Sequence, residues 1–282
     1  MMLQKLESVL HTSNGAVASF NIVDLGMARA ILTAAEELER PVIVGIAVRH
    51  WEKIEAPSLS RSLKDMCEKS SIPTVLHLDH CPPDKFEILE EAVELGFTSV
   101  MIDGSKLPFE ENVEITRRAV DFAHPRGVSV EAELGAIGGI EGEAKNVDAT
   151  SPSLFTNPEE AARFIKASGA NALAVSVGTA HGIYTSAPEI RFDIISRIAG
   201  VCPVPLVLHG ASGVPDESIQ RSVAAGISKI NYFSGLLVKA MDTVRAQSQT
   251  EGNDYLAFRD LLVEGWKEDA KRQIALYSVE DQ

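Results

Sequence analysis

The amino-acid sequence predicts a single (β/α)8 barrel, an α/β fold in which eight parallel strands alternate with helices. Eight short apolar runs alternate with amphipathic segments of helical period along the chain. Runs such as Val42-Ile43-Val44 and Leu206-Val207-Leu208 are apolar on both faces, as parallel strands covered on both sides should be. The length of 282 residues suits one such barrel. A doubly wound open sheet is the alternative, because alternation alone does not close a barrel.

The apolar runs are the expected strands of the sheet. They recur between segments of helical period, and several end in a glycine or a polar residue. In chain order they are residues 16–21, 42–48, 74–79, 98–103, 128–134, 172–177, 205–209 and 228–231.

The expected helices fill the intervals between these strands. Pro158-Glu159-Glu160 and Pro215-Asp216-Glu217 place proline and acidic residues where a first helical turn favours them. Glycines stand where a helix C-cap with positive φ is wanted, at Gly96, Gly127, Gly169 and Gly226. The helices are residues 24–39, 57–70, 83–95, 110–123, 158–168, 192–199 and 216–225, followed by a C-terminal helical extension. Without a visible repeat or linker, we expect one domain over residues 1–282.

One connection breaks this rhythm. Residues 135–157 show little periodicity and far exceed the usual βα loop of about 2–6 residues. The segment contains four glycines and two glutamates, among them Glu141. It is either a surface insertion or a mobile active-site lid, and we favour the lid.

Composition excludes several classes of protein. Lys and Arg number 26 against 40 Asp and Glu, and the resulting net charge of −14 repels nucleic acid and anionic membranes. The three cysteines show no paired spacing, which suits a reducing compartment. The N-terminus lacks the apolar core of a signal peptide, and no apolar run is long enough to span a bilayer. We therefore expect a cytoplasmic protein.

Three histidines follow different expected strands at the end where barrel active sites lie. They are His80, His181 and His209. A single histidine in such a place is more often structural, but three that converge with one position open are typical of a catalytic zinc site. His77 has the opposite parity to His80, and Cys81-Pro82-Pro83 breaks the strand directly after His80. We therefore expect His80 to be a ligand and His77 to be structural or to support a ligand.

Acidic residues accompany these histidines. Asp79 precedes His80, and it either orients a metal-bound histidine or transfers a proton. Glu131 and Glu133 alternate along one strand and so share a face. They are candidate ligands or hydrogen-bond partners of a ligating histidine, and a salt bridge inside the barrel is the alternative.

Small residues follow the last two expected strands, the usual phosphate-binding location of such barrels. Gly210-Ala211-Ser212-Gly213 and Asn231-Tyr232-Phe233-Ser234-Gly235 allow backbone N–H groups to approach an anion, aided by a helix N-terminus. The chain has neither a GxxxxGK[ST] nor a GxGxxG pattern, so nucleotide binding has no support.

These motifs together resemble the class II, zinc-dependent ketose-bisphosphate aldolases, with tagatose-bisphosphate and related aldolases the most similar. The resemblance covers nearly the whole chain. Its markers are His77-Leu78-Asp79-His80, Met101-Ile102-Asp103-Gly104-Ser105, Val130-Glu131-Ala132-Glu133-Leu134-Gly135 with Gly138-Gly139, Gly178-Thr179-Ala180-His181-Gly182 and Leu208-His209-Gly210-Ala211-Ser212-Gly213.

The resemblance implies a role for each matched residue. His80, His181 and His209 would bind zinc, and Asp79 would be the acid/base at the aldehyde oxygen. Glu141 would move the proton at the nucleophilic carbon. Asp103 and Glu133 match an alternative or second cation position, and a monovalent cation is a further candidate cofactor. The candidate residues for binding dihydroxyacetone phosphate are Asn21, Gly182, Gly210, Ala211, Ser212, Asn231 and Ser234.

Two departures from the family pattern bear on the sugar. Ala47 stands where a small hydroxyl residue is expected after the second strand, and Arg49, His50 and Trp51 follow it. The usual Asn-x-x-Thr after the last strand is Asn231-x-x-Ser234, with a bulkier residue pair between. Arg49 and His50 are therefore candidates to meet an anionic acceptor end, with a solvent-facing position as the alternative.

The sequence thus predicts a zinc aldolase that cleaves a ketose 1-phosphate or bisphosphate, and we expect a homodimer or homotetramer. No lysine ends an expected strand, since Lys106 and Lys229 only flank strands, so an imine mechanism has no candidate. An aldolase of the same mechanism acting on an unphosphorylated or otherwise anionic ketose is the alternative. A barrel metallohydrolase lacks its usual His-x-His at Ser19-Phe20-Asn21. A non-catalytic partner subunit would not need Asp79 and Glu141.

Overall fold

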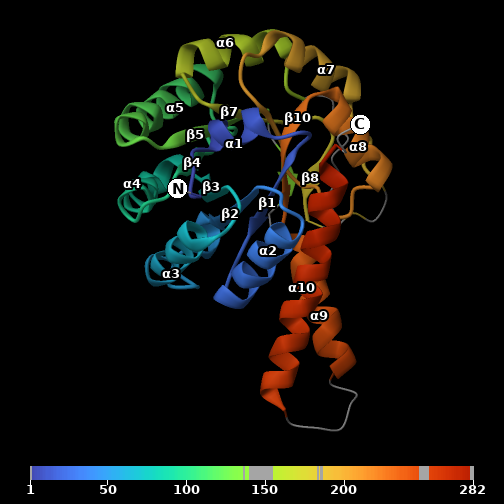
Figure 1. Cartoon of the computed structure of the whole chain (residues 1–282). Coiled ribbons are helices and arrows are strands. Elements are labelled where there is room, and N and C mark those ends of the chain that lie inside the picture. Colours follow the sequence, from blue (N-terminus) through green and yellow to red (C-terminus); the bar gives the residue numbers. More distant parts are fainter. Residues whose placement is uncertain are drawn as a thin grey trace.

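The structure is a computed structural model that describes residues 2–135, 137–139, 155–182, 184, 187–247 and 254–279. Eight parallel strands close into a barrel in the order β1-β10-β9-β7-β5-β4-β3-β2, with helices around them (Figure 1). The predicted (β/α)8 barrel is confirmed, and the open-sheet alternative is wrong. Most of the long connection after the fifth strand, including Glu141, lies outside the described residues.

The barrel strands coincide with the predicted runs to within a few residues. They are β1 Val17–Asn21, β2 Val42–Ala47, β3 Thr74–Cys81, β4 Ser99–Ile102, β5 Ser129–Leu134, β7 Ala172–Val175, β9 Leu206–Leu208 and β10 Ile227–Tyr232. Two further short strands, β6 Gly138–Gly139 and β8 Ala180–His181, pair with each other outside the barrel. The predicted end of the third strand at residue 79 is wrong, because β3 continues through His80 to Cys81.

Helices follow the strands as predicted. They are α2 Leu25–Glu37, α3 Ala56–Lys69, α4 Phe86–Glu94, α5 Phe109–Ala123, α6 Pro158–Ser168, α7 Phe192–Val201 and α8 Asp216–Ala225. Short 3-10 turns are η1 Val48–His50, η2 Pro83–Lys85 and η3 His124–Arg126, so the predicted helix at residues 83–95 is divided between η2 and α4. The four predicted C-cap glycines all have positive φ. At Gly226, a Cβ would also lie 2.6 Å from Cβ of Ala199.

The amino-terminal helix α1 Leu6–Thr12 was not predicted. It lies across one end of the barrel (Figure 1), where its apolar residues join a separate core inside the strands. That core consists of Leu6, Val9, Leu10, Val17, Ile43, Val75, Met101, Ala172, Ala174 and Val207. The N–H of Leu6 donates to Oγ of Ser129 at 3.0 Å, which ties the helix to β5. The helix thereby closes the barrel end opposite the carboxyl ends of the strands.

Two further helices complete the described chain. They are α9 Ser234–Gln247 and α10 Tyr255–Tyr277, and their connected ends project beyond the barrel (Figure 1). Trp266 of α10 is buried, and its indole N–H donates to the carbonyl of Leu236 at 3.0 Å. Within the described residues, no helix is long and apolar enough to cross a membrane.

Candidate metal centre at the barrel mouth

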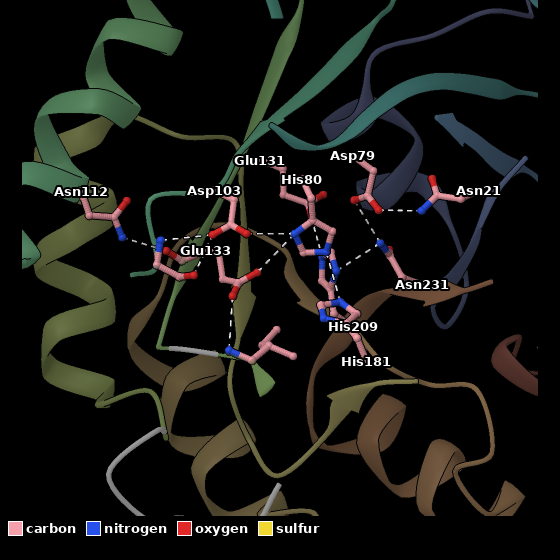
Figure 2. Close-up of polar contacts among 12 residues, drawn as sticks. Asn21, Asp79, His80, Asp103, Asn112, Glu131, Glu133, His181, His209 and Asn231 are labelled. Carbon is pink, nitrogen blue, oxygen red and sulfur yellow. Dashed lines mark hydrogen bonds and ion pairs between the residues drawn. The ribbon is translucent and has the colours of Figure 1, made fainter. Parts of the chain in front are cut away.

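Three histidine side chains meet at the carboxyl ends of the barrel strands. His80 comes from β3, His181 from β8 and His209 from the residue after β9 (Figure 2). One ring nitrogen from each lies within 4.8 Å of the other two. The ring centroids are 4.6 Å apart for His80 and His209, 4.7 Å for His80 and His181, and 5.6 Å for His181 and His209. The three predicted ligands are therefore brought together.

The backbone at His80 explains how two consecutive side chains reach this site. His80 has a φ of +48°, in the left-handed region that non-glycine residues seldom adopt. The pairing of β3 with β4 shifts register between Leu78 and Cys81. Asp79 and His80 both lie in the cluster as a result (Figure 2), although a regular strand would turn them to opposite faces. The reorientation that we assigned to Cys81-Pro82-Pro83 therefore occurs at His80 itself.

His80 is held between a carboxylate and an imidazole. Its Nδ1 lies 3.1 Å from Oδ2 of Asp103, and its Nε2 lies 3.1 Å from Nε2 of His181. Ser105 donates to Oδ1 of Asp103 through both its hydroxyl and its backbone N–H. Burial alone would raise the pKa of Asp103, but the hydrogen bonds from His80 and Ser105 hold it well below its ordinary range. An ionised Asp103 makes Nδ1 of His80 the donor and leaves Nε2 as a lone pair.

The carboxylate of Glu131 orients His209. Its Nε2 lies 3.0 Å from Oε1 of Glu131, and the other oxygen of Glu131 accepts from Nζ of Lys229 at 2.8 Å. Burial raises the pKa of Glu131, but Lys229 and His209 outweigh it and lower the pKa to about 2. We predicted that Glu131 would be either a hydrogen-bond partner of a ligating histidine or part of a salt bridge inside the barrel. It is both, because it contacts His209 and forms a buried salt bridge with Lys229.

The histidine ring nitrogens that do not face carboxylates are suited to bind a cation. With Nδ1 of His80 and Nε2 of His209 donating to carboxylates, Nε2 of His80 and Nδ1 of His209 are left as acceptors. Burial and the neighbouring imidazoles lower the pKa of both His181 and His209, so these rings are neutral at neutral pH. Nε2 of His80 faces Nε2 of His181 at 3.1 Å. Imidazoles whose ring nitrogens converge in this way are the donor set that Zn²⁺ prefers.

Glu133 and Asp103 form a second acidic group with His80. Oε2 of Glu133 lies 3.9 Å from Nδ1 of His80 and is buried without a hydrogen-bond partner among the described residues. Burial and the nearby Asp103 raise the pKa of Glu133 well above its ordinary value. His80, Asp103 and Glu133 can each offer a ligand atom within 4.8 Å of the others. The oxygens of Asp103 and Glu133 suit a cation beside the three-histidine group, whereas Nδ1 of His80 is already hydrogen-bonded to Asp103.

His77 lies deeper in the barrel and outside the three-histidine group. Its Nδ1 lies 2.8 Å from Oγ of Ser99, and its Nε2 lies 3.6 Å from Oδ1 of Asp79 and 3.8 Å from Oε2 of Glu131. His77, Asp79 and Glu131 also lie within 4.8 Å of one another. The ammonium of Lys229 already binds that oxygen of Glu131, so a second cation has no place there.

Asp79 is oriented by two asparagines. Asn21 donates to its Oδ2 at 2.6 Å, and Asn231 donates to its Oδ1 at 3.3 Å (Figure 2). Asp79 is fully buried, which would raise its pKa, but His80 and His77 hold the pKa well below its ordinary value. The site therefore holds an ionised carboxylate in a defined orientation beside the histidines. Asn21 and Asn231, predicted as substrate ligands, contact Asp79 in this structure.

The small residues predicted to bind phosphate surround a hollow next to His181. It is lined by His181, Gly182, Gly210, Ser212, Asn231, Phe233 and Ser234. At Gly210, a Cβ would lie 2.3 Å from the carbonyl oxygen of Ala180, so only glycine fits. Oγ of Ser212 accepts from the N–H of Gly235 at 3.1 Å, which joins the two predicted segments. Ala211, between Gly210 and Ser212, is buried and does not line this hollow.

Phe233, in the predicted segment after the last strand, forms a wall of the hollow. Two contributors to the site were not predicted. Lys229 reaches the histidine cluster through Glu131. The hydroxyl of Tyr184 contacts the carbonyls of Ala180 and Gly210, each at 2.8 Å, and accepts from the N–H of Ala180. It fastens the segment carrying His181 to the segment after His209. No local pattern in the sequence marks these contacts.

Arg49 and His50 follow β2 at the same end of the barrel. Arg49 is exposed, whereas His50 is half-buried with its ring 5.4 Å from the ring of Phe233. Nδ1 of His50 is buried, and no described residue forms a hydrogen bond with it. Burial, assisted by Arg49 and Lys53, lowers the pKa of His50 to about 4. His50 is therefore a neutral ring that supports the wall of the hollow.

The stem of the predicted lid pairs with the strand that carries His181 of the candidate metal centre. Gly138 pairs with Ala180 and Gly139 pairs with His181 in the sheet formed by β6 and β8. Glu141, the predicted proton-transfer residue, follows two positions later and lies outside the described residues.

Comparisons with known proteins agree with this geometry. The family model for class-II fructose-bisphosphate aldolase matches residues 2–282. YdjI of Escherichia coli (strain K12), described as uncharacterized, is 36% identical over 262 residues, which span 93% of this chain and 91% of that protein.

Two solved structures are similar over almost their whole length. The YdjI aldolase from Escherichia coli K12 has a TM-score of 0.86 and 33% identity, and the match covers 98% of this chain and 97% of that one. A putative fructose-1,6-biphosphate aldolase from Coccidioides immitis has a TM-score of 0.85 and 26% identity, with 96% and 94% covered. The barrel, the histidine cluster and these relatives together show that the chain belongs to the class-II fructose-bisphosphate aldolase family and is an aldolase.

Proposed function

We propose that this aldolase is zinc-dependent and reversibly cleaves a ketose 1-phosphate or ketose bisphosphate into dihydroxyacetone phosphate and an aldehyde. The observation that carries the proposal is the convergence of three histidine nitrogens within 4.8 Å beside the ionised Asp79. A zinc site with three protein ligands leaves a position for substrate.

His80, His181 and His209 would hold the zinc ion, with Nε2 of His80 and Nδ1 of His209 as two of the donors. When bound, Zn²⁺ supplies Lewis-acid stabilisation of the negative charge that carbon–carbon cleavage leaves on the substrate oxygens. Asp103 and Glu133 would form an alternative or second cation position, which their distances to His80 support. A monovalent cation is a secondary proposal.

Asp79 would be the acid/base at the aldehyde oxygen. In the cleavage direction it takes the proton from the hydroxyl on the carbon that becomes the aldehyde, and in the synthetic direction it returns that proton. The hydrogen bonds from Asn21 and Asn231 support this role, because they fix where the carboxylate points. Glu141 would carry the proton at the nucleophilic carbon of dihydroxyacetone phosphate. A non-catalytic partner subunit would have no need of this oriented carboxylate.

The phosphate of dihydroxyacetone phosphate would lie in the hollow beside His181. Gly182, Gly210 and Ser212 line it, Ala211 lies between the last two, and α9 begins at Ser234 with backbone N–H groups that favour an anion. The net charge of −14 opposes an anionic substrate, so a local site of this kind is required.

The acceptor end would be read by Arg49 and His50. Ala47 lies opposite Asp79 in the pairing of β2 with β3, so the residues that follow it extend past the catalytic carboxylate. The ring contact between His50 and Phe233 at this end keeps open the alternative, an aldolase of the same mechanism that acts on an unphosphorylated or otherwise anionic ketose. Assembly as a homodimer or homotetramer and a cytoplasmic location stay predictions.

A substrate screen tests this proposal. Zinc-loaded protein would be incubated with ketose 1-phosphates, ketose bisphosphates and unphosphorylated ketoses, and release of dihydroxyacetone phosphate would be followed by its enzymatic reduction. We expect release from at least one phosphorylated ketose, and we expect substitution of Arg49 or His50 by alanine to raise KM for the preferred one. Release from none of the panel, with zinc bound, would contradict the proposed substrate class.

A further inference from the structure

Lys229 occupies an unusual environment for a lysine. Among the residues that the structure describes, no other lysine or arginine is buried. Lys229 lies on β10, two residues before Asn231, and its side chain contacts the inside of the barrel rather than solvent. A buried ammonium is costly unless it is paired and hydrogen-bonded, so its single ion pair needs a reason.

The partner of Lys229 is far away in both sequence and sheet order. Nζ of Lys229 donates to Oε2 of Glu131 at 2.8 Å, and two strands, β9 and β7, separate β10 from β5. The other oxygen of Glu131 lies 3.0 Å from Nε2 of His209. All three side chains have no solvent exposure. Lys229, Glu131 and His209 thus form one buried hydrogen-bonded network that ends at the candidate metal centre.

A competing partner shows what Lys229 prevents. Nε2 of His77 lies 3.8 Å from Oε2 of Glu131 and has no hydrogen-bond partner in the part of the chain that the structure describes. Without the ammonium, the carboxylate of Glu131 is free to turn toward His77. Oε1 would then leave His209, and only the longer contact of 3.3 Å between its Nδ1 and Nδ2 of Asn231 would still specify which nitrogen carries the proton.

We propose that Lys229 is a positioning residue that acts through Glu131 to fix the tautomer of His209. By holding Oε2, it keeps Oε1 aimed at Nε2–H of His209 and leaves Nδ1 as a lone pair for the metal. This inference rests on the proposed zinc centre for its consequence, but the tautomer itself is a property of the metal-free protein. Such outer partners of ligating histidines typically change metal affinity by about 10–100-fold.

The first test measures the tautomer without metal. In metal-free protein with ¹⁵N-labelled histidine, the His209 signals, assigned by their loss in His209→Gln, should show a protonated Nε2 and a bare Nδ1. Lys229→Met should shift these signals toward a mixture of tautomers, whereas Lys271→Met, which breaks the exposed pair with Glu37, should not. Unchanged His209 signals in Lys229→Met would overturn the proposal.

The second test separates positioning from simple charge balance. Lys229→Met leaves Glu131 buried without its cation, so the variant is also made as Glu131→Gln/Lys229→Met, which removes both charges. We expect the double variant to recover thermal stability but to bind Zn²⁺ about 10–100-fold more weakly than the wild type in competition with a chromophoric chelator. If the double variant recovered both thermal stability and zinc affinity, Lys229 would serve only to neutralise the charge of Glu131, and the proposal would be overturned. Absence of zinc binding by the wild type would instead contradict the proposed function and leave the tautomer test standing.

Discussion

Asp79 and His80 are consecutive residues of β3, yet both side chains lie in the same polar cluster at the barrel mouth (Figure 2). The left-handed backbone at His80, with φ of +48°, makes this possible. Sparsely populated backbone conformations of this kind cost about 1–3 kcal/mol and concentrate at functional sites. The arrangement places an ionised carboxylate one residue from a candidate metal ligand, which is the basis of the predictions that follow.

Removal of one imidazole should remove the metal. We expect His181→Ala to lose most of its bound zinc and its activity while far-UV circular dichroism stays unchanged, because the barrel cores do not include this side chain. The loss should exceed the roughly 10–100-fold effect of removing an outer partner. His11→Ala, an exposed histidine on α1, is the matched control. Full zinc occupancy in His181→Ala by metal analysis would show that the ligand set is wrong.

Asp79 should matter for turnover rather than for metal binding. Asp79→Ala should retain zinc and lose about 10²–10⁴-fold in kcat, the usual contribution of a general acid/base. Asp79 is fully buried, so Asp79→Asn serves as the variant that preserves its shape, while its single amide oxygen accepts from only one of the two asparagines. If Asp79→Ala lost zinc to the same extent as His80→Ala, Asp79 would be an orienting residue of the metal site.

The lid residue can be tested without any acceptor aldehyde. Glu141→Ala should spare zinc binding but slow hydrogen exchange at the nucleophilic carbon of dihydroxyacetone phosphate, because that carbon would lose its acid/base. Exchange is followed by NMR in deuterated water. Glu143→Ala, in the same segment, is the matched control. Equal exchange in both variants and the wild type would remove Glu141 from the mechanism.

His50 gives a pH-dependent contribution to stability. Its pKa is about 4 in the folded protein against an ordinary 6.5, so between these values the unfolded chain binds a proton that the folded protein does not. Stability should therefore fall as the pH drops through this window. His50→Gln should lose less stability than the wild type between pH 7 and pH 5 in urea unfolding of the metal-free protein. If both proteins lost the same free energy of unfolding between pH 7 and pH 5, protonation of His50 would not contribute to the pH dependence of stability.

The sequence predicted those features that local patterns determine. Alternation of apolar runs and amphipathic segments located the barrel strands and the helices that follow them, because burial on both faces leaves a short-range signal. Strand-end histidines located the cluster that forms the candidate site. The closure of the barrel by α1 was missed, since its seven residues carry too little periodicity.

Contacts across the barrel were not predictable in the same way. Glu131 and Lys229 are 98 positions apart, and nothing near either residue marks its partner. The left-handed φ of His80 was also missed, because β-strand patterns assume regular alternation and a histidine does not signal an exception as glycine would. Tyr184 fastens two loops through its hydroxyl, and a tyrosine in a loop has no pattern that specifies such a role.

The most direct test of the account is whether dihydroxyacetone phosphate release follows zinc. Activity toward the best ketose phosphate would be measured in zinc-loaded protein, after removal of metal by a chelator, and after zinc is restored, with borohydride treatment in the presence of substrate as a parallel arm. We predict loss on chelation, recovery with zinc and no inactivation by borohydride, because Lys229 is buried in its ion pair with Glu131. Full activity in the stripped protein, or borohydride inactivation with covalent labelling of a lysine, would contradict the account.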